Sequence, residues 1–182
     1  MKNAPTKAPL KKHPSTNESA IIIGQLQLLP HPEGGWYREM YRSDELIPLS
    51  SLPGRYNSQH CFSTSVYFLL EKDDFSAFHR ITSDETWHFY MGSPVIIYCI
   101  FADGSATQVV LGNNLAKGQL LQYTIIRNCW FAAKNQEDNP FSLVGCTVSP
   151  GFEFTDFELG QRKTLVDLYP QYHNIISELS RI

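Results

Sequence analysis

Short segments in which apolar and polar residues alternate, or apolar residues run together, cover most of residues 36–149. Residues 36–42 (WYREMYR) alternate, which places Tyr37, Glu39 and Tyr41 on one face of a strand. Further segments rich in aromatic and β-branched residues lie at 62–70, 75–81, 85–92, 95–101, 106–112, 118–126, 128–133 and 141–149. Such segments are typical of β-strands. The pattern therefore predicts a chain built mainly of short strands.

Glycine, proline and aspartate separate these segments, and Asp103-Gly104 is a hairpin signal. Residues 19–35 predict a short helix or turn that ends at Pro30 and is followed by a tight loop. Only residues 165–182 resemble a longer helix, and no internal repeat is evident. Many short strands with almost no internal helix predict an all-β fold, an antiparallel barrel or sandwich.

Charge divides the chain into two parts. Residues 1–20 carry a net charge of +3 and have almost nothing to bury, whereas the remainder carries −6. We therefore predict a disordered basic tail at 1–20 and one domain at 21–182. A domain this acidic is disfavoured as a nucleic-acid binder, which needs a basic face.

The cysteines and the apolar runs bear on the location of the protein. The cysteines are widely spaced, form no C-x-x-C pair and lie in or beside strand-like runs, which favours reduced, packed thiols. The N-terminus has no apolar core of a secretory signal, and no apolar run reaches about 18 residues. We expect a soluble, cytoplasmic protein that does not enter a membrane.

The segment FHRITSDETWHFYMG (78–92) holds most of the candidate chemistry. Its spacing runs from His79 to position 81, then three residues to Glu85, then six residues to Gly92. This is the spacing of the first cupin motif, in which the second histidine is replaced here by Ile81. The segment therefore resembles a cupin motif that lacks one metal ligand.

Two other segments extend the resemblance, HPEGGWYREMYRS (31–43) and VGCTVSPGFEFTDFELG (144–160). Together they are similar, over about residues 24–180, to an uncharacterised group of the cupin superfamily that is often labelled sugar-epimerase-like. The resemblance implies an RmlC-like cupin jelly-roll β-barrel with a short N-terminal helix or turn and a C-terminal helix. It also implies a small-molecule ligand inside the barrel and a homodimer.

The second cupin motif has its best match at 126–131. Asn128 can adopt the left-handed turn conformation, but Ile126 replaces a proline and Phe131 replaces the third histidine. Two ligands, His79 and Glu85, are too few for a stable transition-metal site. We therefore predict no cofactor. A divalent metal held by His79, Glu85 and His88 stays open as an alternative. Strand alternation puts His88 on the opposite face from Glu85, unless a bulge intervenes. His31 and Glu153 are other possible ligands.

The remaining chemistry is acid–base catalysis without metal. Histidine exchanges protons near neutral pH, so we assign His79 as the general base, Glu85 as its orienting carboxylate and Tyr67 as the acid. An arginine, Arg38, is the candidate for binding an anionic group. The other candidate ligand-binding residues are Tyr41, His88, Trp130 and Glu33.

Three hypotheses follow. The first is a metal-independent isomerase or epimerase of a carbohydrate-like or nucleotide-sugar substrate; the others are a non-catalytic ligand-binding cupin and a metal-dependent cupin enzyme. Purely structural explanations also stay open: Asp84-Glu85 as a turn, Arg38 and Arg42 paired with acidic neighbours on an outer face, and most aromatic rings as core.

Overall fold

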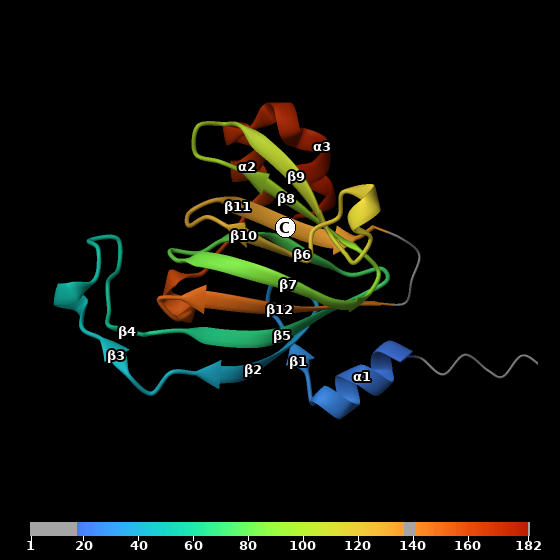
Figure 1. Ribbon diagram of the computed structural model, residues 1–182. Helices are drawn as coiled ribbons and strands as arrows, with labels where there is room; N and C mark the ends of the chain where they lie inside the picture. Colours follow the sequence, from blue (N-terminus) through green and yellow to red (C-terminus); the bar gives the residue numbers. More distant parts are fainter. Residues whose placement is uncertain (1–17, 137–140, 182) are drawn as a thin grey trace, which may run out of the picture.

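A computed structural model describes residues 18–136 and 141–181, and the strands within them form two antiparallel sheets that face each other (Figure 1). The six-stranded sheet has the order β1 (Leu29–Pro30), β2 (Trp36–Arg42), β5 (Thr64–Glu71), β12 (Phe141–Ser149), β7 (Asp84–Gly92), β10 (Gln122–Ile125). The five-stranded sheet has the order β13 (Glu158–Leu159), β6 (Phe75–Arg80), β11 (Trp130–Asn135), β8 (Val95–Ile100), β9 (Ala106–Leu111). The short strands β3 (Leu46–Ile47) and β4 (His60–Cys61) pair separately.

The main core lies between the two sheets. Inward residues of the six-stranded sheet, among them Phe68 and Val144, pack against Ile97 and Phe131 of the other sheet. Alternate residues of each strand point into this space, so the opposite set faces outward. This confirms the two-layer antiparallel fold predicted from the strand pattern.

Helices cover the outside of the sheets. The helices α2 (Arg162–Leu168) and α3 (His173–Glu178) pack on the outer face of the five-stranded sheet, where Leu165 and Ile176 are buried. The helix predicted at 165–182 is therefore two helices, because Pro170 opens the 3₁₀ turn Pro170–Tyr172 between them and lacks the N–H that a continuous helix needs.

Helix α1 (Glu18–Leu26) packs against the outer face of the six-stranded sheet. It begins at Glu18, so the last residues of the predicted 1–20 tail are helical; residues 1–17 lie outside the described part of the chain. None of the described helices is long and apolar enough to cross a membrane. The other 3₁₀ helices of the described residues are Leu49–Ser51, Leu115–Lys117 and Phe154–Asp156.

Several local predictions are confirmed. All four cysteines are free and buried. Asn128 adopts φ 60, the left-handed conformation expected of its turn. The hairpin between β8 and β9 turns at Gly104, whose φ is +82.

The alternation predicted for residues 36–42 is broken by a β-bulge. The pairing of β2 with β5 shifts between Glu39 and Tyr41, so an extra residue interrupts the period of two. Tyr37 and Glu39 point between the sheets, and after the bulge Arg42 does so as well. Tyr41 is instead 54% exposed.

Candidate functional site

A cavity of about 250 Å³ opens between the two sheets. Its wall is largely aromatic, with the rings of Tyr37, Phe68, Trp87, Phe152, Phe154 and Phe157. Its acidic and basic side chains are His31, Glu33, Glu39, Arg42, His79 and Glu85. An apolar pocket with a few convergent polar groups is the usual form of a small-molecule site.

Glu33 and His79 form a buried pair on one side of the cavity. The His79 Nδ1–H donates to the Ala77 carbonyl (2.8 Å), so Nε2, 3.1 Å from Glu33 Oε2, is the nitrogen left to accept. Burial lowers the pKa of His79 to about 3. Burial, and then the charge of Glu85, raise the pKa of Glu33 well above its usual value. The lowered pKa of His79 and the raised pKa of Glu33 both favour a neutral pair, in which Glu33 carries the proton and donates it in a hydrogen bond to Nε2.

The loop that carries Glu33 is fixed by its backbone. The Ala77 N–H and the Arg181 Nε–H both donate to the Glu33 carbonyl, at 2.9 and 3.0 Å. The Ser76 hydroxyl donates to Glu33 Oε1 at 2.8 Å. His31 lies beside the carboxyl, with Nδ1 3.5 Å from Oε2, and burial lowers its pKa to about 4. The HPEGG segment therefore delivers a histidine and a carboxyl to the cavity wall.

Glu85 faces the same cavity from β7. Its Oε1 accepts a hydrogen bond from the Trp87 indole N–H at 3.0 Å. Burial raises the pKa of Glu85 to about 7, although hydrogen bonds from Cys146 and Trp87 oppose the shift. The carboxyl is therefore close to half-ionised at neutral pH, which suits proton transfer.

Three predicted site residues lie outside the cavity. Tyr67 points away because its neighbours Val66 and Phe68 point in, and it packs with Trp36 near α1. Arg38 Nη1–H donates to the Leu26 carbonyl at 3.0 Å. Trp130 packs on the outer face beneath α2 and α3, with the Arg80 guanidinium 4.5 Å from its ring centre. The expectation that these side chains face the ligand is corrected.

Tyr41 and His88 also lie elsewhere. Tyr41 is turned outward by the bulge in β2. His88 follows the alternation of β7 to the outer face, where its Nε2 lies 3.3 Å from Thr147 Oγ1. Of the predicted site residues, His79, Glu85 and Glu33 share the cavity.

The residues at the cupin metal positions do not fit a metal. Ile81 lines the cavity as a buried aliphatic side chain, and Phe131 packs on the His79 ring with 4.0 Å between ring centres. Both ring nitrogens of His79 have partners of their own. Within residues 18–136 and 141–181, no three His, Cys, Asp or Glu side chains are arranged to bind one ion. In the set proposed as an alternative, His79 and Glu85 line the cavity from opposite sheets, whereas His88 lies on the outer face of the six-stranded sheet.

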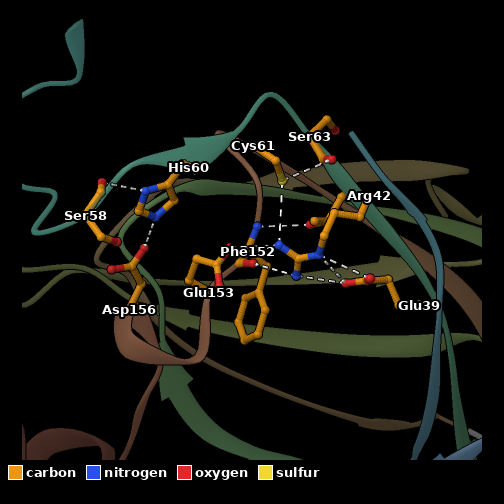
Figure 2. A network of polar contacts seen from close by, with 10 residues as sticks. Glu39, Arg42, Ser58, His60, Cys61, Ser63, Phe152, Glu153 and Asp156 are labelled. Atoms are coloured by element: carbon orange, nitrogen blue, oxygen red, sulfur yellow. Dashed lines mark hydrogen bonds and ion pairs between the residues drawn. The ribbon is translucent and has the colours of Figure 1, made fainter. Parts of the chain in front are cut away.

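Residues 152–157 form one side of the cavity and are held from two points (Figure 2). The Arg42 Nη1–H donates to Glu153 Oε1 at 2.7 Å, and Nη2–H donates to the Phe152 carbonyl at 3.1 Å. His60 Nε2 lies 2.5 Å from Asp156 Oδ2, while its Nδ1–H donates to the Ser58 carbonyl at 3.0 Å. These contacts keep the three phenylalanines of the segment against the cavity.

Sequence reasoning did not assign Glu39, Arg42, Cys146 or the phenylalanines at 152, 154 and 157 to the site. The alternation of phenylalanine in GFEFTDF, inside a recognised motif, is a signal for the last three. The sequence leaves Arg42 open between an outer face and the pocket: strict alternation in β2 places it with Arg38, which lies outside the cavity, and the bulge turns Arg42 inward.

A two-sheet jelly roll with a cavity between its sheets and remnants of the cupin ligand set defines a cupin protein. The chain matches the Cupin superfamily (DUF985) over residues 20–160, and it belongs to this family. It is 40% identical to protein SO0799 of Shewanella oneidensis, with a TM-score of 0.81 over 90% of this chain and 97% of that one. A hypothetical protein from Leishmania major is 32% identical, with a TM-score of 0.81 over 90% and 99% of the two chains.

A curated relative is the uncharacterised yeast protein YML079W, 27% identical over 160 residues, which are 82% of this chain and 78% of that protein. Oxalate decarboxylase from Bacillus subtilis is a distant structural neighbour, 12% identical, with a TM-score of 0.50 over 82% of this chain and 36% of the enzyme. That likeness shows the fold alone.

Proposed function

We propose that the cavity is a metal-independent acid–base site that moves a proton on a small carbohydrate-like molecule, as an isomerase or epimerase does. The observation that carries the proposal is Glu85, a carboxyl with a pKa of about 7 in an aromatic cavity that also holds the protonated Glu33. A base and an acid whose environments set different pKa values are the requirement for this chemistry.

The proton transfer follows from these two groups. The Glu85 carboxylate takes a proton from a carbon next to a carbonyl, and the C–H electron pair forms a C=C bond. The carbonyl π pair moves to oxygen, which takes the proton of Glu33. To give the isomer, Glu85 returns its proton to the former carbonyl carbon, and the hydroxyl on the first carbon gives its proton to Glu33 and becomes the new carbonyl. To give the epimer, the planar intermediate turns over, Glu85 returns its proton to the other face of the same carbon, and the oxygen returns its proton to Glu33. The reaction is redox-neutral and needs no added reactant.

His79 has a different role in this proposal from the general base expected from the motif. Its Nδ1–H donates to Ala77, Nε2 faces Glu33, and its pKa is about 3. No lone pair of the ring is left for a substrate, so we assign His79 as the positioning residue that holds the Glu33 proton.

Proton exchange tests the proposal. The full chain is incubated in D₂O with neutral aldoses and ketoses, and loss of the C–H signal next to the carbonyl is followed by NMR. We expect exchange with wild type, a loss of at least about a hundredfold for Glu85→Gln, and wild-type rates for the exposed Glu158→Gln. Equal exchange by wild type and Glu85→Gln refutes the assignment. For His79, a shift in the pH profile of His79→Gln separates positioning from a purely structural effect.

The second candidate is a non-catalytic ligand-binding cupin. It is favoured by the hydrogen-bond partners of His79: because Nδ1 pairs with the Ala77 carbonyl and Nε2 with Glu33, neither nitrogen is left to react with a ligand. Saturable binding of a sugar with no deuterium incorporation over many hours supports this candidate against the first.

We also propose the homodimer that the family resemblance implies. Sedimentation equilibrium then gives a mass twice that of the 20.7 kDa chain. A monomer mass at micromolar concentration contradicts the proposal.

A further inference from the structure

All hydrogen-bond donors of Arg42 are already used at the cavity wall. Its Nε–H and one Nη2–H donate to Glu39, at 3.2 and 2.9 Å. The other Nη2–H donates to the Phe152 carbonyl, and Nη1 donates to Glu153 (2.7 Å) and to the Cys61 sulfur (3.7 Å) (Figure 2). A guanidinium group has five N–H donors, so none is left for a ligand.

Arg42 is also the only lysine or arginine among the described residues that line the cavity. It is paired with two carboxylates, Glu39 and Glu153. His31 and His79 are neutral near pH 7, since burial lowers the pKa of each. The cavity and its rim therefore carry more negative than positive charge.

An anionic ligand finds no unpaired lysine or arginine among the described residues of such a site. Moving an anion from water into an apolar cavity without a cation to pair with costs several kcal/mol. Glu85, when ionised, adds repulsion. The same carboxylate attracts a ligand that presents an N–H or O–H, and aromatic faces favour a cation over an anion.

We infer that the ligand of this cavity carries no negative charge and is a compact molecule with an apolar body and an N–H or O–H donor for Glu85. Among ligands of one size, affinity then decreases from amine to alcohol to carboxylate. The inference rests on the site described under the proposed function and narrows its substrate class. Within that class it excludes nucleotide sugars, sugar phosphates and sugar acids, and it retains neutral sugars and amino sugars.

Three ligands of similar size test this order of affinities: benzylamine, benzyl alcohol and benzoate. A cavity of about 150 Å³ holds a benzene ring, so the present cavity of about 250 Å³ accommodates each of them. Isothermal titration calorimetry of the full chain at pH 7.5 is expected to show benzylamine tightest and benzoate weaker by at least about tenfold. Benzoate binding as tight as benzylamine overturns the inference.

A gain of function tests the role of Arg42. The double variant Glu39→Gln/Glu153→Gln removes both carboxylates that neutralise the guanidinium, and we expect benzoate affinity to rise by at least about tenfold while benzylamine affinity falls. Glu158→Gln, which removes an exposed carboxylate paired with Arg80, is the matched control and leaves both affinities unchanged. If the double variant unfolds, Glu153→Gln alone is used and a smaller gain is expected. A folded variant with no gain overturns the role of Arg42.

The two proposals fail separately. Tight benzylamine binding together with no deuterium exchange on any sugar keeps the ligand class and removes the catalytic function. Deuterium exchange on a sugar phosphate that matches or exceeds exchange on the neutral sugar keeps the catalytic function and removes the ligand class.

Discussion

The protonation state of Glu33 follows from the single acceptor left on His79. Because His79 Nδ1–H donates to a carbonyl, Nε2 of the neutral ring has only a lone pair to offer Glu33 Oε2, 3.1 Å away. A carboxylate there would face that lone pair without a proton between them. A protonated carboxyl instead donates to Nε2 and accepts from Ser76.

Glu33→Gln tests this arrangement. Glutamine keeps a donor for His79 Nε2 and an acceptor for the Ser76 hydroxyl, so the free energy of unfolding changes by less than about 1 kcal/mol. Glu33→Ala leaves both partners unsatisfied and is expected to cost about 2–4 kcal/mol. Urea unfolding at pH 7 measures both. Equal, large losses for the two variants contradict the neutral pair, because they require an ionised Glu33.

At the scale of elements, segment 152–157 is held mainly by side chains. Apart from short local turns, its hydrogen-bond partners among the described residues are the Arg42 guanidinium, the Thr64 hydroxyl, which accepts from the Phe152 N–H at 3.0 Å, and His60. His60 is fully buried, so its contact with Asp156 is shielded from solvent.

Asp156→Ala removes the buried anchor of this segment. We expect a loss of about 1–3 kcal/mol of unfolding free energy and faster amide hydrogen exchange at 152–157, with exchange in β8 and β11 changed only by the global loss. Glu158→Ala breaks an exposed ion pair and is expected to cost less than about 0.5 kcal/mol. Unchanged exchange at 152–157 in Asp156→Ala shows that His60 does not hold the segment.

Helix α2 offers a matched pair of leucines. Leu165 is fully buried against the five-stranded sheet, whereas Leu168 is 60% exposed. Leu165→Ala is expected to cost about 2–5 kcal/mol and Leu168→Ala less than about 1 kcal/mol, by thermal or urea unfolding. Ligand affinity in folded Leu165→Ala stays at the wild-type value, because the cavity lies between the sheets and α2 outside them. A weaker ligand in that variant indicates that α2 shapes the cavity.

For the whole molecule, the buried groups of the cavity set opposite pH limits on stability. The pKa of Glu85 rises from 4.5 to about 7 on folding, so this group lowers the free energy of unfolding as the pH rises through that range. The pKa values of His31 and His79 fall on folding from 6.5 to about 4 and 3, so these groups lower the free energy of unfolding as the pH drops below about 6.5. The pKa of Glu33 also rises, so burial of this carboxyl costs stability in the same direction as that of Glu85. These four groups together favour maximal stability near pH 5–6.5.

Unfolding free energy measured from pH 4 to 9 checks this expectation. The histidine contributions are the same in the wild type and in Glu85→Gln, so the difference between the two proteins reports the ionisation of Glu85, which costs the wild type stability as the pH rises from 4.5 to about 7. The shift of Glu85 corresponds to at most about 3 kcal/mol, and solvent in the cavity reduces this, so Glu85→Gln should gain about 1–2 kcal/mol relative to wild type at pH 8 and little at pH 4. An equal difference between the two proteins at both pH values contradicts the raised pKa.

The amino-acid sequence by itself determined the class of fold, the reduced cysteines and three of the cavity residues. Strand periodicity is a local property, and the motifs fix the spacing of His79 and Glu85 along two consecutive strands of the chain and the place of Glu33 in the turn before residue 36. The direction of His88 stayed open in the sequence, because a bulge could have reversed the alternation; β7 has no irregularity between Glu85 and Phe89, and His88 faces outward.

Only the tertiary structure decided which partner each group meets. Because of the bulge in β2, Arg42 rather than Tyr41 faces the cavity, and nothing in the local pattern marks where an extra residue enters a strand. The pairing of His79 with Glu33, and of His60 with Asp156 across 96 positions of the chain, depends on how the sheets close over one another. Protonation states follow from that closure, since burial rather than residue type sets the pKa values of Glu33, His79 and Glu85.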